Sequence, residues 1–262
     1  MTSIYFRNQA YQAAKRYWQG THRTASPEAT LERVRPYFKS IGLTRIANIT
    51  GLDRIGIPVT ISIRPNSYSV VTSSGKGTTL EAAIISAAME SIELHCAETI
   101  QLPEITLPYS QLTEKYRVIP LEHLHLRENS LFNINRPEQW CLGWDMAHQN
   151  EVAVPVQAVS MNYHRFWYKE AENLGSFEMG SNGLASGNHF LEALSSALYE
   201  LIERDAISCY LEAFIKTNRL PRVHLETIQS PIILSLLEKF EAAQVVPILF
   251  ECTVDTEIPV YR

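Results

Sequence analysis

Apolar and polar residues alternate along several short segments and recur at helical spacing along a few longer ones. From Ile57 to Ile63, isoleucine or valine fills every second position, so residues 55–64 are predicted to form a half-buried strand. Other short segments of similar character predict strands at 45–50, 68–72, 151–161, 245–250 and 258–261. Long segments with apolar residues three and four apart predict helices at 78–100, 188–216 and 231–244.

The first forty residues are polar and are predicted to be helical. Ser26 is suited to cap a helix whose first turn holds Pro27 and Glu28, and this helix should end near Lys39. Gly42 then stands where a helix often ends in the left-handed conformation. Three segments lack a clear period and are predicted as loops: 73–77, 101–150 and 175–187.

This order of elements predicts an α/β fold of the mixed α+β kind, in which mixed or antiparallel sheets are covered by long helices. An internal similarity adds to this picture. Residues Gly77–Glu93 align without a gap on Gly187–Glu203, and 7 of the 17 positions are identical. Either the chain contains two related halves that face each other, or two helices have converged on a similar composition.

Each of the two similar segments ends in the pattern Glu-x-x-Glu. The first contributes Glu90 and Glu93 to one helix face. In the second, one face of the helix carries polar side chains, those of Asn188, Glu192, Ser196, Glu200, Glu203 and Arg204. The opposite face is apolar and is expected to pack, through Leu191, Leu194, Ala197, Leu198, Leu201 and Ile202.

Glutamates three apart on a helix repel each other when both are ionised, and late in a helix they also oppose the helix dipole. The commonest arrangement of such residues is a solvated acidic surface, but a surface helix normally interleaves lysine, and neither stripe contains any. Carboxylate oxygens suit Mg²⁺, whose shell is completed by water and substrate phosphates. The alternative is therefore a site in which four or five glutamates hold more than one metal ion beside a nucleoside triphosphate.

Composition limits the classes of protein to which the chain can belong. The net charge of −5 and the pI of about 5.9 give no sequence-wide basic footprint, so no nucleic-acid partner is expected. No run of about 18 apolar residues exists, so no membrane-spanning helix is expected. The N-terminus lacks the apolar core of a secretory signal, and the four cysteines form no Cys-x-x-Cys pair. The chain is therefore predicted to be cytoplasmic with reduced thiols, and Cys96 and Cys209 are expected to be buried structural residues.

Five segments together resemble the YcaO family: 51–58, 74–77, 90–93, 181–188 and 200–206. Their motifs are GLDRIGIP, SGKG, ExxE, SNGLAxGN and ELIERDA, where x is any residue. Within that family, Gly20–Arg23 and the first of these segments look most like the subgroup that works with a TfuA-type partner.

This resemblance implies an ATP- and Mg²⁺-dependent enzyme that activates a peptide backbone amide. A nucleophile adds to the carbonyl carbon, and the oxygen is then phosphorylated and leaves as phosphate. A neighbouring Cys, Ser or Thr side chain would give an azoline, and external sulfide would give a thioamide. The resemblance further implies a peptide or protein substrate, a possible TfuA-type partner protein and a homodimer, the state common in the family.

The resemblance also implies roles for individual residues. The metal ligands would be Glu90, Glu93, Glu192, Glu200 and Glu203. The residues that contact ATP would be Arg23, Thr30, Asn188, Ser196 and Arg204. Leu94 departs from the family pattern, because many relatives have an arginine directly after Glu-x-x-Glu.

The family normally runs well beyond this length. Residues 1–262 are therefore predicted to be the N-terminal portion of a single YcaO-like domain, with weak or absent catalysis on its own. Two other functions stay open: a nucleotide-binding or scaffold domain that binds a partner without chemistry, and a Mg²⁺-dependent phosphotransferase acting on a small molecule. Mg²⁺-dependent ATP binding and then peptide-dependent ATP consumption would separate the three.

Overall fold

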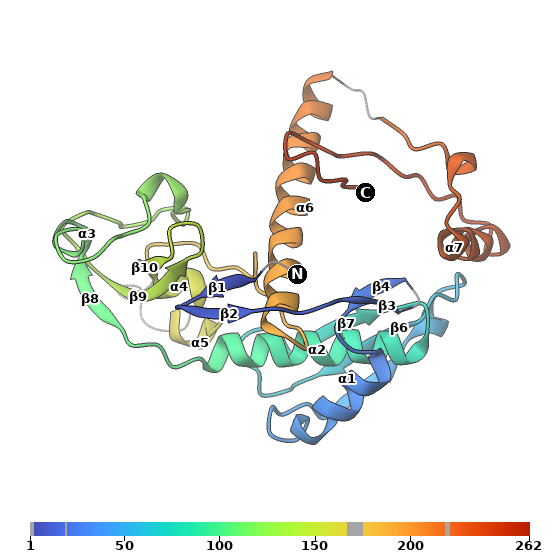
Figure 1. Cartoon of the computed structure of the whole chain (residues 1–262), viewed down its shortest axis with the longest axis horizontal. Helices are drawn as coiled ribbons and strands as arrows, with labels where there is room; N and C mark the ends of the chain where they lie inside the picture. Colours follow the sequence, from blue (N-terminus) through green and yellow to red (C-terminus); the bar gives the residue numbers. More distant parts are fainter. Residues whose placement is uncertain (1–2, 19, 167–174, 218–220) are drawn as a thin grey trace.

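Two long helices dominate the chain, α2 (Leu80–Thr99) and α6 (Phe190–Thr217), and the lower end of α6 meets α2 near the centre of the molecule (Figure 1). The computed structural model describes residues 3–18, 20–166, 175–217 and 221–262. The shorter helices and helical turns are α1 (Pro27–Val34), η1 (Arg35–Tyr37), η2 (Thr50–Leu52), α3 (Tyr109–Leu112), η3 (Leu121–His123), α4 (Val156–Val159), α5 (Tyr163–Phe166), η5 (Leu225–Thr227) and α7 (Pro231–Ala242). Within these described ranges, no helix combines the length and the apolar character needed to cross a membrane.

The strands form small antiparallel sheets. Two hairpins lie near the N-terminus, β1 (Ile4–Phe6) with β2 (Gln9–Tyr11) and β3 (Arg16–Trp18) with β4 (Thr21–Arg23). Two three-stranded sheets have the orders β5–β6–β7 and β10–β9–β8. Their strands are β5 (Arg45–Asn48), β6 (Val59–Ile63), β7 (Thr72–Lys76), β8 (Ile105–Pro108), β9 (Pro137–Asp145) and β10 (Asn150–Pro155). The mixed α/β class predicted from the sequence is therefore confirmed.

α2 lies directly on the sheet β5–β6–β7. Its first turn is capped by Thr79, whose hydroxyl oxygen accepts from the backbone N–H of Ala82 at 3.1 Å. A Cβ on Gly75 of β7 would lie 2.1 Å from the carbonyl oxygen of Ala83 and 2.3 Å from the amide nitrogen of Ala87. Only glycine at this position allows the strand and the helix to approach so closely, and this contact fixes where α2 stands on the sheet.

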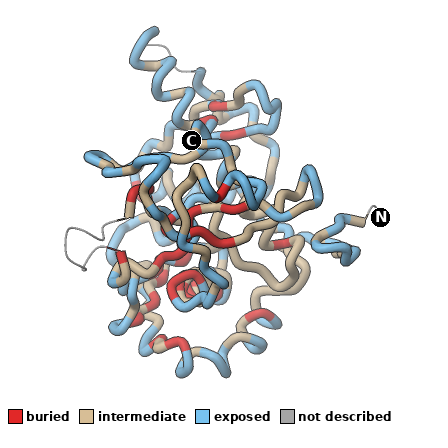
Figure 2. The backbone as a smooth tube through the Cα atoms, turned by 90° about the vertical axis from the view of Figure 1, so that its left-hand side faces the viewer, coloured by how far each residue is buried: buried red, intermediate tan, exposed pale blue. Residues whose placement is uncertain are grey.

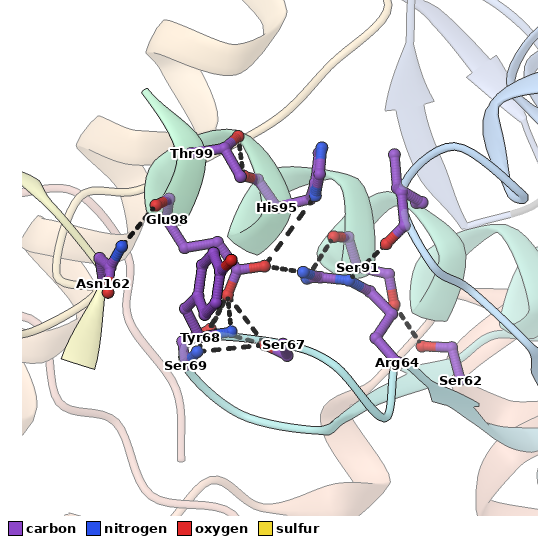
Figure 3. Close-up of polar contacts among 11 residues, drawn as sticks. Ser62, Arg64, Ser67, Tyr68, Ser69, Ser91, His95, Glu98, Thr99 and Asn162 are labelled. Atoms are coloured by element: carbon purple, nitrogen blue, oxygen red, sulfur yellow. Dashed lines mark hydrogen bonds and ion pairs between the residues drawn. The ribbon is translucent and has the colours of Figure 1, made fainter. Parts of the chain in front are cut away.

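The other end of α2 is held by a buried ion pair between Arg64 and Glu98, whose side chains are at most 4% exposed (Figure 3). Arg64 also donates to the carbonyl oxygen of Ser91 at 2.9 Å. The second oxygen of Glu98 accepts four hydrogen bonds of 2.8–3.0 Å from hydroxyl and backbone N–H groups of residues 67–69. This carboxylate is thus fully satisfied, and it ties the loop between β6 and β7 to the helix.

The sheet β10–β9–β8 has its own core, which lies to the left in Figure 1. Trp140 of β9 is completely buried and packs edge-to-face against Phe177, with the ring centroids 5.7 Å apart. Its indole N–H donates to the carbonyl oxygen of Leu107 at 3.0 Å. The core is closed by Leu112 and Ala153.

α6 is packed very differently, because only Glu192 and Ala206 among its residues are buried. Its predicted apolar face is wrong in part, since Leu198 and Leu201 are 50% and 44% exposed. The C-terminal segment, residues 250–262, packs on the side of the helix around Ala206 and leaves these leucines facing solvent. Figure 2 shows that most of the tube at the top of the molecule is exposed.

The helical prediction for residues 1–40 is wrong before residue 27. Arg7 and Asn8 have φ angles of 49° and 64°, so a two-residue turn joins β1 to β2. The usual sequence signal for such a turn contains glycine, which is absent here. α1 does begin as predicted, with the Ser26 hydroxyl accepting from the Ala29 N–H at 3.2 Å, but it passes into η1 after Val34.

Several strand and loop predictions also need correction. β7 occupies 72–76, most of the segment predicted as a loop, and not 68–72. The segment 101–150 contains the nine-residue strand β9, although it was expected to be irregular. Residues 245–250 and 258–261 contain no strand and form only isolated β-bridges, at Phe250 and Tyr261. In each case pairing with distant segments, which local pattern does not encode, decides the outcome.

The cysteine prediction is wrong for two residues. Cys96 and Cys209 are exposed, on the outward sides of the two long helices, whereas Cys141 and Cys252 are buried. A helix of which one side faces solvent can carry cysteine there, and neither exposed thiol contributes to a core.

Candidate functional site

A cavity of about 830 Å³ lies where the two long helices meet. It is lined by α2, by the first half of α6, by the glycine-rich segment 181–188, by the β3–β4 hairpin and by α1. Nine of the ten residues singled out from the sequence line it: Arg23, Thr30, Glu90, Glu93, Asn188, Glu192, Ser196, Glu200 and Arg204. The tenth, Glu203, is exposed and lies outside the lining.

α2 contributes Glu90 and Glu93 from two successive turns. Burial raises the pKa of Glu90, while the backbone N–H of Ser74 and the charge of Lys76 counteract this rise. Burial also raises the pKa of Glu93 to about 7; hydrogen bonds from the side chain and backbone of Ser186 counteract this rise, and the negative charges of Glu90 and Glu200 add to it. Glu93 of α2 and Glu200 of α6 thus line the same cavity.

α6 places three more polar side chains on the same cavity. Arg204 forms an ion pair with Glu200 one turn earlier, with 2.6 Å between Nη2 and Oε1. Ser196 accepts a hydrogen bond of 3.1 Å from the guanidinium of Arg23, which reaches it from the end of β4. Two arginines therefore line the cavity beside α6, and their guanidinium groups suit phosphate oxygens.

Glu192 stands apart from the other glutamates because it is only 2% exposed and fully hydrogen-bonded. Its Oε2 accepts from the backbone N–H of Thr24 at 2.7 Å and from the Thr24 hydroxyl at 2.6 Å. Its Oε1 accepts from the backbone N–H of Asn188 at 3.3 Å. Burial alone would raise the pKa of Glu192, but these hydrogen bonds hold it below the ordinary value.

Asn188 joins α6 to α1. Its side-chain amide donates to the buried hydroxyl of Thr30 at 2.9 Å, and its oxygen accepts from Arg33 at 3.1 Å. The Thr30 hydroxyl also donates to the backbone oxygen of Ser26 at 2.7 Å. Thr30 is only 4% exposed, so it does not face solvent. These contacts bring the N-terminal segment and α6 together at one edge of the cavity.

Sequence reasoning missed four residues that shape this site: Thr24, Arg33, Lys76 and Ser186. Thr24 and Arg33 act through distant partners on α6, which no local pattern reveals. Lys76 and Ser186 lie within two of the segments that carry the family resemblance, and this position in the sequence could have identified them as residues of the site.

A close glycine contact precedes each of the two acidic helices. A Cβ on Gly77 would lie 2.8 Å from the amide nitrogen of Ala83, and a Cβ on Gly187 would lie 2.8 Å from that of Ala193. These two pairs are the ones that the 110-residue shift aligns. The same close glycine contact therefore precedes both acidic helices.

The donor set fits a hard divalent cation in its chemistry. In this conformation, no three His, Cys, Asp or Glu side chains of the described residues lie close enough together to hold a metal ion. Mg²⁺ does not require three, because it commonly binds one or two carboxylates and takes its other ligands from water and phosphates. Glu90, Glu93 and Glu200 face a single cavity large enough for such a ligand.

Comparison with known proteins gives consistent results. The family described as YcaO cyclodehydratase, ATP- and Mg²⁺-binding, matches residues 74–262. A protein described as lying in the tfuA 3′ region of Rhizobium leguminosarum bv. trifolii is 32% identical over 241 residues, which cover 91% of this chain and 56% of that protein. A protein of Methanothermobacter thermautotrophicus is 36% identical over 242 residues, or 88% of this chain and 58% of the relative. The chain thus spans little more than half the length of these curated relatives.

Solved structures show the same fold. A heterocyclase in complex with substrate and cofactor superposes with a TM-score of 0.76 at 18% identity, over 96% of this chain and 36% of that one. The structure of YcaO from Methanopyrus kandleri, bound with AMPPCP and Mg²⁺, gives a TM-score of 0.63 at 26% identity, over 95% and 56% of the two chains. Because the family model matches residues 74–262, well over half of the sequence, the chain belongs to the YcaO family.

Proposed function

We propose that the cavity binds ATP together with Mg²⁺, and that the chain belongs to an enzyme that activates a peptide backbone amide by phosphorylation. The observation that carries this proposal is the meeting of acidic side chains from α2 and α6, with two arginines, at one cavity of suitable size. The relative from Methanopyrus kandleri, 26% identical, is bound with AMPPCP and Mg²⁺, which supports the choice of ligand.

The proposed roles follow from the chemistry of each side chain. Glu90, Glu93 and Glu200 would hold Mg²⁺, because they line the cavity and are not saturated by backbone donors as Glu192 is. Arg23 and Arg204 would bind phosphate oxygens, which they can do through parallel N–H groups. Thr30, Asn188 and Ser196 would contribute neutral hydrogen bonds to the nucleotide or fix the loops around it.

Glu192 and Glu203 remain predicted metal ligands, but each would first have to change its hydrogen bonds or its position. Glu192 could reach a cation only by exchanging its hydrogen bonds to Thr24 and Asn188. Glu203 is exposed and could join the site only after a change in the position of its side chain.

In the proposed reaction, a nucleophile adds to the amide carbonyl carbon and the amide oxygen takes the terminal phosphoryl group of ATP. That oxygen then leaves as phosphate, and a neighbouring side chain gives an azoline or external sulfide gives a thioamide. Mg²⁺, when bound, offsets the charge of the phosphates. The arginines of the cavity would stabilise the negative charge on the transferred group.

Nucleotide binding tests the first part of this proposal. AMPPCP titrated into the chain by calorimetry should bind with MgCl₂ and much more weakly with EDTA. Glu90→Gln should remove most of the Mg²⁺ dependence, whereas Glu81→Gln, an exposed glutamate at the start of the same helix, should not. Binding that is equal with and without Mg²⁺ would contradict the proposal.

Turnover tests the second part. ATP consumption should depend on added peptide, and the peptide should lose the mass of water or exchange oxygen for sulfur. Small-molecule phosphotransfer without a peptide would instead favour a phosphotransferase.

A second candidate function is a nucleotide-binding scaffold that docks a partner protein and does no chemistry. The exposed apolar side chains of α6, Leu198, Leu201, Leu211 and Ile215, favour it, because such residues mark interaction surfaces when they gather. A TfuA-type protein is the proposed partner, on the evidence of the Rhizobium relative's description. Mg²⁺-dependent binding without any peptide-dependent ATP consumption is the outcome that would favour this function.

A further inference from the structure

The wall of the cavity that α2 forms carries carboxylates and no basic side chain. Residues Leu80–Thr99 contain neither lysine nor arginine, and both Glu90 and Glu93 line the cavity. Leu94, next to this pair, is buried against other apolar side chains and offers no polar group. A triphosphate against this wall meets negative charge, so a cation from another element would strengthen its binding.

Lys76, the last residue of β7, is placed to be that cation. It is exposed and lines the cavity, and its ammonium charge favours the ionised form of Glu90. Its backbone is firmly anchored, because Gly75 and Gly77 on either side are packed closely on α2. A Cβ at these glycines would lie 2.1 and 2.5 Å from atoms of the helix.

The other cations of the cavity already have partners. Arg204 pairs with Glu200, and Arg23 donates to Ser196. Among the described residues that line the cavity, Lys76 is the one Lys or Arg for which no hydrogen bond or ion pair is formed. Its ammonium group is therefore available to a ligand without first breaking a contact.

We propose that Lys76 binds a phosphate oxygen of the nucleoside triphosphate on the α2 side of the cavity, across from Arg23 and Arg204. This rests on the proposed function, since it assigns a further residue to the same site. A lysine ammonium is a compact charge with three donors on a flexible stem, which suits a phosphate lying beside metal ions. The carboxylates of α2 would then bind cations while Lys76 offsets the charge of the phosphates.

The test compares ligands with and without phosphates. AMPPCP with MgCl₂, and separately adenosine, are titrated by calorimetry into the wild-type chain and into Lys76→Met and Lys76→Arg. Loss of one charged hydrogen bond should weaken AMPPCP binding about tenfold in Lys76→Met and leave adenosine binding unchanged. Lys76→Arg should recover most of the affinity, and the matched control Lys115→Met, an exposed lysine outside the cavity, should bind as the wild type does.

Two failures can be told apart. If the wild type binds AMPPCP and Lys76→Met binds it equally well, the role of Lys76 is wrong while the proposed function stands. If the wild type does not bind AMPPCP with Mg²⁺, the proposed function fails and the role of Lys76 fails with it. Equal weakening of AMPPCP and adenosine would also overturn the assignment, because it would indicate a damaged cavity. Should Lys76→Met not fold, Lys76→Gln takes its place in the same comparison.

Discussion

α2 and α6 carry the same Glu-x-x-Glu pattern, yet α2 is embedded in the molecule and α6 is largely exposed. Eight of the 20 residues of α2 are buried, against two of the 28 residues of α6. α2 is fixed at one end by the contact of Gly75 and at the other by the ion pair of Arg64 with Glu98. The upper half of α6 (Figure 1) is supported on one side, where Ala206 packs against Cys252 and Val260.

The difference affects the acidic residues directly. Both glutamates of the α2 pair line the cavity, and the pKa of one of them, Glu93, is raised to about 7 by burial. On α6 only Glu200 of the corresponding pair lines the cavity, and Glu203 faces solvent. An acidic pattern on a helix therefore indicates a potential site, and the packing of that helix decides which of its carboxylates line the cavity.

The largest expected effect comes from comparing one ion pair of α2 with one ion pair of α6. Glu98→Gln leaves Arg64 buried without its counter-charge and should lower the free energy of unfolding by about 3–5 kcal/mol. The matched change on α6 is Glu212→Gln, which breaks the exposed pair with Lys216 and should cost less than about 0.5 kcal/mol. Urea denaturation followed by circular dichroism measures both. Equal losses would show that α2 is no better anchored than α6.

The contact of β7 with α2 should give the next effect. Gly75→Ala forces a Cβ against the backbone of Ala83 and Ala87, and overpacking of this kind should cost about 2–3 kcal/mol or more. Gly51→Ala is the control, because a Cβ there meets nothing within 4 Å. Thermal unfolding of the two variants should differ clearly, and a Gly75→Ala protein as stable as the control would refute the tight contact.

A smaller effect concerns pH. A Glu93 carboxyl in the unfolded chain loses its proton near 4.5, and in the folded chain near 7. Between these values the unfolded state binds fewer protons, so the stability of the wild type falls as pH rises through this window, and the loss is complete above pH 7. Glu93→Gln should therefore be more stable than the wild type by roughly 1–3 kcal/mol at pH 8 and about equal to it near pH 4.

Urea denaturation at the two pH values measures this difference. Glu203→Gln, in the exposed position of the α6 pair, is the control and should not reproduce it. The same stability difference at both pH values for Glu93→Gln would argue against a buried, protonated Glu93.

The smallest effect is expected on the apolar surface of α6. Ile215 is 82% exposed, so Ile215→Ala should change the free energy of unfolding by less than about 0.5 kcal/mol. Differential scanning calorimetry of the isolated chain checks this. A loss of 2 kcal/mol or more, on the order expected for truncating a core residue, would mean that this surface is covered in solution.

Much of the helical structure was predictable because it depends on local signals. Ser26 caps α1 as predicted, and the apolar periods predicted both ends of α2 and α6 to within two residues. The polar stripes of the two helices could likewise be found from helical spacing, and they led to seven of the residues that line the cavity. The other two, Arg23 and Thr30, came only from the family resemblance.

The rest depends on tertiary contacts. β7 has the sequence Thr-Ser-Ser-Gly-Lys, which contains few residues that favour strands, and it is a strand because it pairs with β6 under α2. The exposure of Leu198 could not be deduced either, because an apolar helix face does not state whether another element exists to cover it. For the same reason the spacing could not separate Glu200, inside the cavity, from Glu203, outside it.

The hydrogen bonds of Glu192 have a consequence for how the site would be loaded. Its carboxylate holds the Thr24 amide and hydroxyl, and Thr24 follows directly after Arg23 in the chain. An ion that recruited Glu192 would release Thr24 in the same event and give the neighbouring guanidinium new freedom. Binding of the cation and movement of the Arg23 side chain would then be coupled, so that a change in one equilibrium would shift the other.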